Sequence, residues 1–358
     1  MTTAHLRVVV GHSNDFAEHK MNANHPESPS RSNVVRDAAE RLGERVGRYV
    51  VKPATRLAVE RIHHTLYVDE IAATAGCTES VVFDEDVSAC AKTYETALLA
   101  AGAAIGAVDA VFDGSQRAFS LARPPGHHAE VDRAMGFGFF NNVAIAAQHA
   151  IDTGRCRRVA IVDWDVHHGN GTQRSFETRR DVLFVSSHVP RLFPVSTGHY
   201  KERGRGQGEG FTINIPLPRE GTDDDIFCLH QRITVPVLEA FEPDLILISA
   251  GFDAHILDAA SDQRITAEGY ARLAALLFDV ADRVCGGRVA LILEGGYDLD
   301  SLGESVEAVL EAAIDPSRFL NRPPPVPGDL LAAMLEKIVD FHVDVWPMLR
   351  VPQFDGER

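Results

Sequence analysis

The feature that most constrains this chain is a short apolar run that ends abruptly in carboxylates and imidazoles. Residues 159–162 read Val-Ala-Ile-Val, which predicts a buried β-strand, and Asp163-Trp-Asp-Val-His-His-Gly-Asn-Gly171 follows at once. Residues two apart in an extended segment point the same way, so Asp163, Asp165 and His167 share one face. Unpaired charges are costly to bury, so such a cluster is rarely kept for stability alone. Its oxygen and nitrogen donors predict a divalent cation site, with Zn²⁺ as the first choice.

Three further apolar runs end in the same way. Residues 118–122 lead into Arg123-Pro-Pro-Gly-His-His128, residues 244–249 into Ala250-Gly-Phe-Asp253, and residues 288–293 into Glu294-Gly-Gly-Tyr297. In open parallel α/β sheets, ligands bind beyond the carboxyl ends of the strands. For any one motif, the alternative is a salt-bridged strand end beside ordinary core histidines or a simple turn. The agreement of four motifs favours a functional site at one sheet edge.

Helical patterns alternate with these strands. Apolar residues recur at three-to-four spacing in Ser32–Glu44, Thr93–Phe112, Asn142–Thr153, Asp224–Glu239, Thr266–Val284 and Leu299–Ala313. This alternation predicts an α/β protein with a mostly parallel central sheet covered on both faces. We expect one catalytic domain over residues 1–320. Residues 321–358 then form a proline-rich connector and a C-terminal helix, packed on the same domain or on a second subunit.

Composition narrows the classes of partner and compartment. The formal net charge is −16, which disfavours nucleic-acid binding and is compatible with cationic substrates. The five cysteines are scattered without a Cys-x-x-Cys pair, which is typical of a reducing compartment. The N-terminus lacks the pattern of a secretion signal, and no apolar run approaches the roughly 20 residues of a membrane helix. We therefore expect a cytoplasmic protein that binds neither membrane nor nucleic acid.

Five ordered motifs together resemble the histone deacetylase superfamily. They are Arg123-Pro-Pro-Gly-His-His128, Gly136-Phe-Gly-Phe-Phe-Asn-Asn142, Asp163-Trp-Asp-Val-His-His-Gly-Asn-Gly171, Ser249-Ala-Gly-Phe-Asp253 and Glu294-Gly-Gly-Tyr297. The similarity is greatest to the class II-like bacterial branch, which includes acetylpolyamine amidohydrolases, and it runs from about His25 to Val309. It implies an arginase/deacetylase-like three-layer α/β/α fold and a metal-dependent hydrolase of linear amides.

The resemblance also implies a role for each motif. Asp165, His167 and Asp253 would ligate one Zn²⁺ per chain, with open positions for water and a carbonyl oxygen. The implied catalytic residues are His127, His128, Asp163, Asn170 and Tyr297. His128 would act as general base and then acid, oriented by Asn170, while Asp163 orients His127. Many deacetylases have aspartate where this chain has Asn170. Tyr297 would donate a hydrogen bond to the oxyanion.

A substrate path follows from the same resemblance. Phe137, beside Gly136, and Phe193 resemble the aromatic walls of an acyl-lysine tunnel, although both could be ordinary core residues. Gly295 would line the site next to Tyr297. Arg31 resembles an arginine that lines an inner channel for acetate, and a surface arginine at a helix start is the alternative.

The resemblance further implies bound K⁺ or Na⁺. The residues of the first cation site would be Asp163, Asp165, His167, Ser186 and Ser187. A second site would use the backbone carbonyls of Phe176, Arg179, Val182 and Phe211. Backbone carbonyls would also contribute heavily to the first site.

Three functions remain open from the sequence. The favoured one is deacetylation of acetyl-lysine in a protein or peptide, and the second is hydrolysis of an acetylpolyamine or another small N-acyl amine. The third is an inactive acyl-lysine binding protein, which the complete set of site residues disfavours.

Acidic residues that could reach the pocket rim and favour polyamines are Asp15, Glu18, Glu27, Asp84 and Asp86. Asp258-Ala-Ala260 replaces the more usual Asp-Pro-Leu at that rim. We also expect a homo-oligomer.

Overall fold

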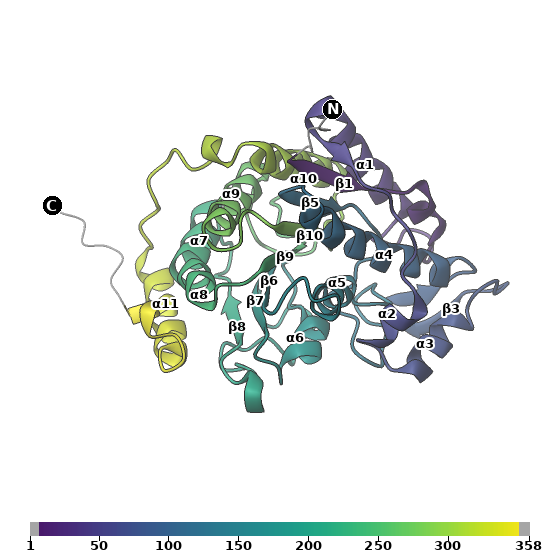
Figure 1. Cartoon of the computed structure of the whole chain (residues 1–358), viewed down its shortest axis with the longest axis horizontal. Helices are drawn as coiled ribbons and strands as arrows, with labels where there is room; N and C mark the ends of the chain where they lie inside the picture. The colour runs from purple at the N-terminus through teal and green to yellow at the C-terminus, as the bar shows by residue number, and fades with distance from the viewer. Residues whose placement is uncertain (1–6, 351–358) are drawn as a thin grey trace.

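A parallel eight-stranded sheet forms the centre of the protein in a computed structural model that describes residues 7–350 (Figure 1). Its strand order is β2-β1-β5-β10-β9-β6-β7-β8, and every pairing in it is parallel. In that order the strands are Gly47–Arg48, Val8–Gly11, Arg117–Ser120, Val289–Leu293, Leu245–Ala250, Val159–Asp163, Val182–His188 and Thr212–Pro216.

Both faces of the inner strands are buried, which explains why β10 and the first four residues of β6 are continuously apolar rather than alternating. Along β6, Val159 and Ile161 pack on one side of the sheet, whereas Ala160 and Val162 pack on the other. A parallel sheet with helices on both faces requires this pattern. The result is the three-layer α/β/α arrangement with a mostly parallel sheet that the sequence predicted.

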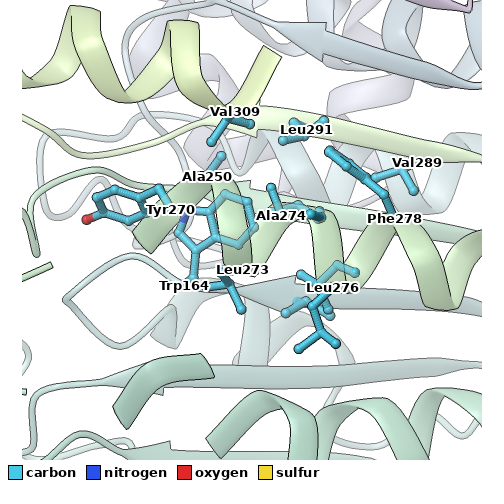
Figure 2. Close-up of a cluster of buried hydrophobic side chains, with 14 of the residues drawn as sticks. Trp164, Ala250, Tyr270, Leu273, Ala274, Leu276, Phe278, Val289, Leu291 and Val309 are labelled. Atoms are coloured by element: carbon cyan, nitrogen blue, oxygen red, sulfur yellow. The ribbon is translucent and has the colours of Figure 1, made fainter. Parts of the chain in front are cut away.

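One helical layer consists of α1, α7, α8, α9 and α10, and the other of α4, α5 and α6. The bounds of the first are Pro29–Arg41, Asp223–Leu229, Val235–Phe241, Ala267–Val284 and Leu299–Ile314, and of the second Thr93–Phe112, Asn142–Asp152 and Asn170–Phe176. In Figure 1, α9 and α10 lie on the opposite side of the strands from α4 and α5. Figure 2 shows how Tyr270 and Phe278 of α9 pack beside Trp164 and the strand residues Val289 and Leu291.

The expected helices lie close to the observed ones, with local differences at their ends. The helix α4 matches its predicted bounds. The helix α1 begins three residues before the predicted Ser32 because Pro29 occupies its first turn, where a missing N–H costs nothing. The predicted helix Asp224–Glu239 is divided into α7, a π-helical turn at His230–Thr234, and α8.

The expectation about membrane-length segments is wrong for α4. This helix has 20 residues and is long and apolar enough, by length and composition, to cross a membrane. Glu95 and Asp109 interrupt its apolar sequence, so the helix did not stand out as one continuous apolar run. However, 61% of its apolar window is buried inside the molecule, and core helices of soluble proteins have the same composition.

Smaller elements surround the sheet. They are α2 (Arg56–Glu60), α3 (Thr65–Ala72), the antiparallel pair β3 (Val81–Asp84) and β4 (Val87–Ala89), and 3₁₀ turns at Asn14–Glu18, Gly43–Arg45, Gly206–Gly208, Pro316–Arg318 and Pro347–Arg350.

The C-terminal helix α11 (Asp329–His342) and the turn after it contact the segment before β8. Arg203 donates hydrogen bonds to both carboxylate oxygens of Asp344, at 2.9 and 2.8 Å, and Trp346 Nε1 donates to the Gly210 carbonyl at 2.9 Å. Residues 351–358, the end of the expected C-terminal segment, lie outside the described residues.

Truncation of Phe278 tests the core of the larger helical layer. Its ring is completely buried and lies 4.7 Å from the Arg117 guanidinium. The Phe278→Ala variant should lower the free energy of unfolding by about 3–5 kcal/mol, because it removes apolar contacts and leaves a cavity. Urea denaturation measures this, with Leu330→Ala as control, since Leu330 is 77% exposed. Equal midpoints for the two variants would contradict this account of the core.

Candidate active site

Four neighbouring strands deliver polar residues to one edge of the sheet. The strands β5, β10, β9 and β6 are adjacent in that order, and the four polar motifs follow their carboxyl ends. Asp165 and His167 come after β6, and Asp253 comes after β9. One ligand atom from each of these three residues lies within 4.8 Å of the others. The edge predicted from the sequence therefore exists and brings the three side chains together.

The metal-type cluster is built closely around His167. Its Nδ1 lies 3.1 Å from Asp165 Oδ1 and 3.1 Å from Asp253 Oδ2. Backbone N–H groups hold the other oxygens: Gly295 donates to Asp165 Oδ2 at 2.8 Å, and Val166 donates to Asp253 Oδ1 at 3.0 Å. A Cβ on Gly295 would collide with both carboxylates, so this position requires glycine.

The charges of the cluster suit a divalent cation. Burial alone would lower the pKa of His167, but Asp253 and Asp165 outweigh it and raise the pKa to about 10. Burial and the proximity of Asp165 raise the pKa of Asp253. Two buried carboxylates thus need a positive charge between them. Because two oxygens and one nitrogen converge with room for further ligands, the residues fit Zn²⁺ in a catalytic type of site.

The two adjacent histidines occupy opposite electrostatic environments. His127 Nδ1 lies 2.9 Å from Asp163 Oδ2, and Asp163 and Asp165 raise the pKa of His127 well above its ordinary value despite burial. Burial lowers the pKa of His128 well below its ordinary value, and the imidazoles of His127 and His167 lower it further. Neighbouring groups with pKa values driven apart are typical of acid–base sites.

Tyr297 is held from three directions. Its ring lies 5.1 Å from the Arg31 guanidinium and packs edge-on against Phe137 at 5.5 Å. The carboxylate of Asp258 accepts the backbone N–H groups of Tyr297 and Asp298 at 2.6 and 3.0 Å. Burial raises the pKa of the Tyr297 hydroxyl well above its ordinary value, so this group stays protonated as a hydrogen-bond donor.

A cavity of about 370 Å³ opens over this cluster. The residues that line it are Pro26, Asp86, His128, Gly136, Phe137, His167, Phe193, Asp258, Ala259, Ala260 and Tyr297. The ring of Phe193 lies 5.0 Å from that of His128. Phe137 has a φ of 66°, a strained backbone conformation for a side-chain-bearing residue, which often marks a functional position. Both expected aromatic walls therefore line the cavity.

Arg31 is completely buried, so the surface-arginine alternative is wrong. It donates to the carbonyls of Gly296 and Glu294 at 2.7 and 2.5 Å, and to the carboxylate of Glu27 at 3.2 Å. Arg123 also pairs with Glu27, at 2.6 and 2.5 Å, and its charge lowers the pKa of Glu27 to about 2, against the opposing effect of burial. Glu27 is thus an internal anchor rather than a rim residue.

Two carboxylates that support the site were not predicted from the sequence. Glu294 is fully buried and accepts the N–H groups of Gly126 and His127 at 2.7 and 3.1 Å, which fixes the loop that carries both catalytic-type histidines. Burial raises the pKa of Glu294 to about 7. Asp258 fixes Tyr297, as described above. The sequence signal that could have identified Glu294 is an acidic residue directly after a strand and before two glycines.

The residues expected to bind monovalent cations are partly brought together. Asp163 on β6 pairs in register with Ser186 on β7, and Ser187 Oγ lies 3.4 Å from the Asp163 carbonyl. For the second set, the carbonyl of Phe176 accepts an N–H from Arg179 at 2.8 Å, and that of Phe211 accepts one from Phe184 at 2.9 Å. K⁺ or Na⁺ binding stays a prediction.

Comparison with known proteins identifies the family. The histone deacetylase domain model matches residues 25–313. A histone deacetylase-like amidohydrolase of Pseudomonas aeruginosa is 37% identical over 278 residues, which is 77% of this chain and 73% of that protein. The human polyamine deacetylase HDAC10 is 37% identical over 317 residues, which is 83% of this chain and 46% of the human protein.

A solved structure extends the likeness to the whole fold. The crystal structure of the HDA15 HD domain superposes with a TM-score of 0.89 at 33% identity, over 97% of each chain. The fold, the ordered motifs and the polar cluster at the sheet edge agree with these matches. The chain therefore belongs to the histone deacetylase family, whose members hydrolyse amide C–N bonds.

Proposed function

We propose that this protein is a zinc-dependent hydrolase that removes acetyl or related acyl groups from lysine-type amines. The observation that carries the proposal is the convergence of three metal-type donors, the His128 imidazole and the Tyr297 hydroxyl around one aromatic-walled cavity. Each of these groups has a distinct role in amide hydrolysis by water.

Asp165, His167 and Asp253 would hold the zinc ion. Three protein ligands leave further positions open, as a catalytic site requires. When bound, zinc polarises the substrate carbonyl and lowers the pKa of a coordinated water. Asp163 and His127 border this cluster and form a buried pair that keeps a second positive charge beside it.

His128 would accept a proton from the attacking water and then deliver it to the departing amine. Its Nδ1 faces Asn170 Oδ1 at 2.8 Å, so Nε2 is left to act in the cavity. Because burial keeps this imidazole neutral, it is able to accept a proton. Tyr297 would donate to the oxygen on which negative charge develops.

The cavity suits a slim aliphatic chain that ends in an amide. Phe137 and Phe193 offer apolar walls for the methylene stem of lysine. Ala259 and Ala260 are small side chains at the rim, which favours a substrate whose remainder stays outside, as a peptide does. Acetylated proteins or peptides are therefore the proposed partners. Cytoplasmic location, homo-oligomerisation and the absence of membrane and nucleic-acid partners stay predictions.

Hydrolysis of acetylpolyamines is the second candidate. Asp86 lies at the rim and could attract the distal ammonium of a polyamine. Asp258 is less suited to that role because its carboxylate already accepts three backbone N–H groups. An inactive acyl-lysine binder, the third function left open by the sequence, is disfavoured because a general base and an oxyanion donor both face the cavity.

Turnover of an acetyl-lysine peptide and of N-acetylputrescine, measured side by side on zinc-loaded protein, decides between the two substrate classes. We expect the larger kcat/KM for the peptide because the rim is open. If the polyamine is preferred and Asp86→Asn abolishes that preference, the second candidate replaces the first. Turnover of neither by zinc-loaded protein would overturn the proposed activity.

Zinc binding can be tested independently of activity. Adding Zn²⁺ to metal-free protein should raise the thermal unfolding midpoint, because a ligand that binds only the folded state stabilises it. In Asp253→Asn this increase should be lost, together with bound zinc measured by elemental analysis. Asp262→Asn is the matched control, since Asp262 lies exposed on the same loop. Equal zinc content in both variants would contradict the ligand assignment.

The role of Tyr297 is tested by removing a single oxygen atom. Tyr297→Phe should lower kcat on the order of 10²–10³-fold, the effect of losing one oxyanion donor. Zinc content should not change. Tyr94→Phe, on α4, is the control for loss of a hydroxyl elsewhere. Full turnover in Tyr297→Phe would make this tyrosine structural.

A further inference from the structure

The amide of Asn170 can in principle present either of two ends to His128. Its oxygen can only accept a hydrogen bond, whereas its nitrogen can only donate. The two ends have nearly the same size, so packing alone does not distinguish them. Whatever fixes this amide therefore also determines which nitrogen of His128 carries the proton.

Glu130 supplies the contact that fixes it. Asn170 Nδ2 lies 2.9 Å from Glu130 Oε1, and a carboxylate can only accept. The other neighbours of Nδ2 are the carbonyl of His128 and the sulfur of Met135, both acceptors at 3.4 Å. The amide nitrogen therefore faces Glu130, and the oxygen faces His128 Nδ1 at 2.8 Å.

The consequence for His128 follows from hydrogen-bond polarity alone. Because Asn170 Oδ1 accepts, Nδ1 of the neutral imidazole must carry its hydrogen. The lone pair is then on Nε2, which is the nitrogen available to the cavity. The reverse amide orientation would favour the other tautomer, in which Nε2 carries the hydrogen and cannot act as a base.

We infer that Glu130 is a positioning residue that selects the active tautomer of His128 through the amide of Asn170. This inference rests on the proposed function in one respect, the use of His128 as general base. Glu130 does not touch the cavity. Its side chain is 22% exposed and pairs with Arg133 at 3.3 Å, while a separate polar hollow adjoins Glu130 and Asn170 from outside.

The contacts from Glu130 through Asn170 to His128 also explain how this chain functions with asparagine, rather than aspartate, at position 170. An aspartate would accept from His128 in either orientation and would need no second residue to orient it. With an amide at position 170, the nearest carboxylate in this line of contacts belongs to Glu130, one hydrogen bond further from His128. The pair Asn170 and Glu130 together does what one aspartate does in many deacetylases.

The test is a pair of substitutions that reverse each other. Glu130→Lys offers only donors to Asn170, which should turn the amide and lower kcat on the order of tenfold or more, with KM little changed. Glu130→Gln accepts or donates, so its effect should be smaller. Combining Glu130→Lys with Asn170→Asp should restore most of kcat, because the introduced carboxylate accepts from His128 and from the introduced ammonium alike.

The control variant is Asp132→Lys, which makes the same charge change at an exposed position two residues away. It should leave kcat unchanged. Nitrogen-15 NMR of the histidine rings, assigned with His128→Ala, reports the tautomer directly. We expect hydrogen on Nδ1 of His128 in the wild type and in the double variant, and loss of that state in Glu130→Lys.

Two results would overturn the inference. One is an unchanged His128 tautomer in Glu130→Lys, and the other is a double variant no more active than Glu130→Lys alone. The NMR measurement needs no turnover, so it separates this inference from the proposed function. A wild type inactive on every acetyl amide would overturn the proposed activity. The nitrogen-15 signals of His128 would still show whether Glu130 selects its tautomer.

Discussion

The arrangement of the whole site depends on burying Asp165 and Asp253 against the same imidazole. Each isolated charge would be strongly disfavoured in this environment, so the surroundings must compensate for both. Backbone N–H groups from Val166 and Gly295 satisfy one oxygen of each carboxylate, and the other oxygens converge on His167. Glycine at position 295 is a condition of this closeness, because any side chain there would displace both carboxylates. The Gly-Gly-Tyr segment thus serves the metal-type cluster as much as the cavity.

Supporting groups around this cluster follow one plan. Buried carboxylates each fix a backbone segment or a guanidinium that belongs to the site. Glu294 holds the loop of His127 and His128, Asp258 holds Tyr297, and Glu27 holds Arg31. Because ionised carboxylates accept several hydrogen bonds at once, one side chain can fix two N–H groups in a defined geometry. These carboxylates therefore hold His128 and Tyr297 in place through the backbone segments that carry them.

The fold and the inner site were largely predictable because their signals are local. Apolar runs that end in polar motifs predicted the strands, and apolar residues recurring at three-to-four spacing predicted α4 and α9. The supporting contacts were less accessible. Glu27 and Arg123 lie 96 residues apart, and Glu294 and Gly126 lie 168 apart, so no periodicity links them. Burial of Arg31 likewise depends on the loop after β10, whose Glu294 and Gly296 carbonyls accept hydrogen bonds from it, rather than on its own helix. The residue types were visible, but their partners were set by tertiary structure.

The position of β10 has a consequence for how the molecule is made. It is the last strand within residues 7–350, yet it lies in the middle of the sheet, between β5 and β9. Until it has been synthesised and inserted, the sheet consists of two separate parts with unpaired inner edges, which are surfaces prone to wrong pairing. Its insertion joins these parts and at the same time brings Glu294, Gly295 and Tyr297 to the site. A nascent chain therefore completes its central sheet and its active site in the same late step of folding.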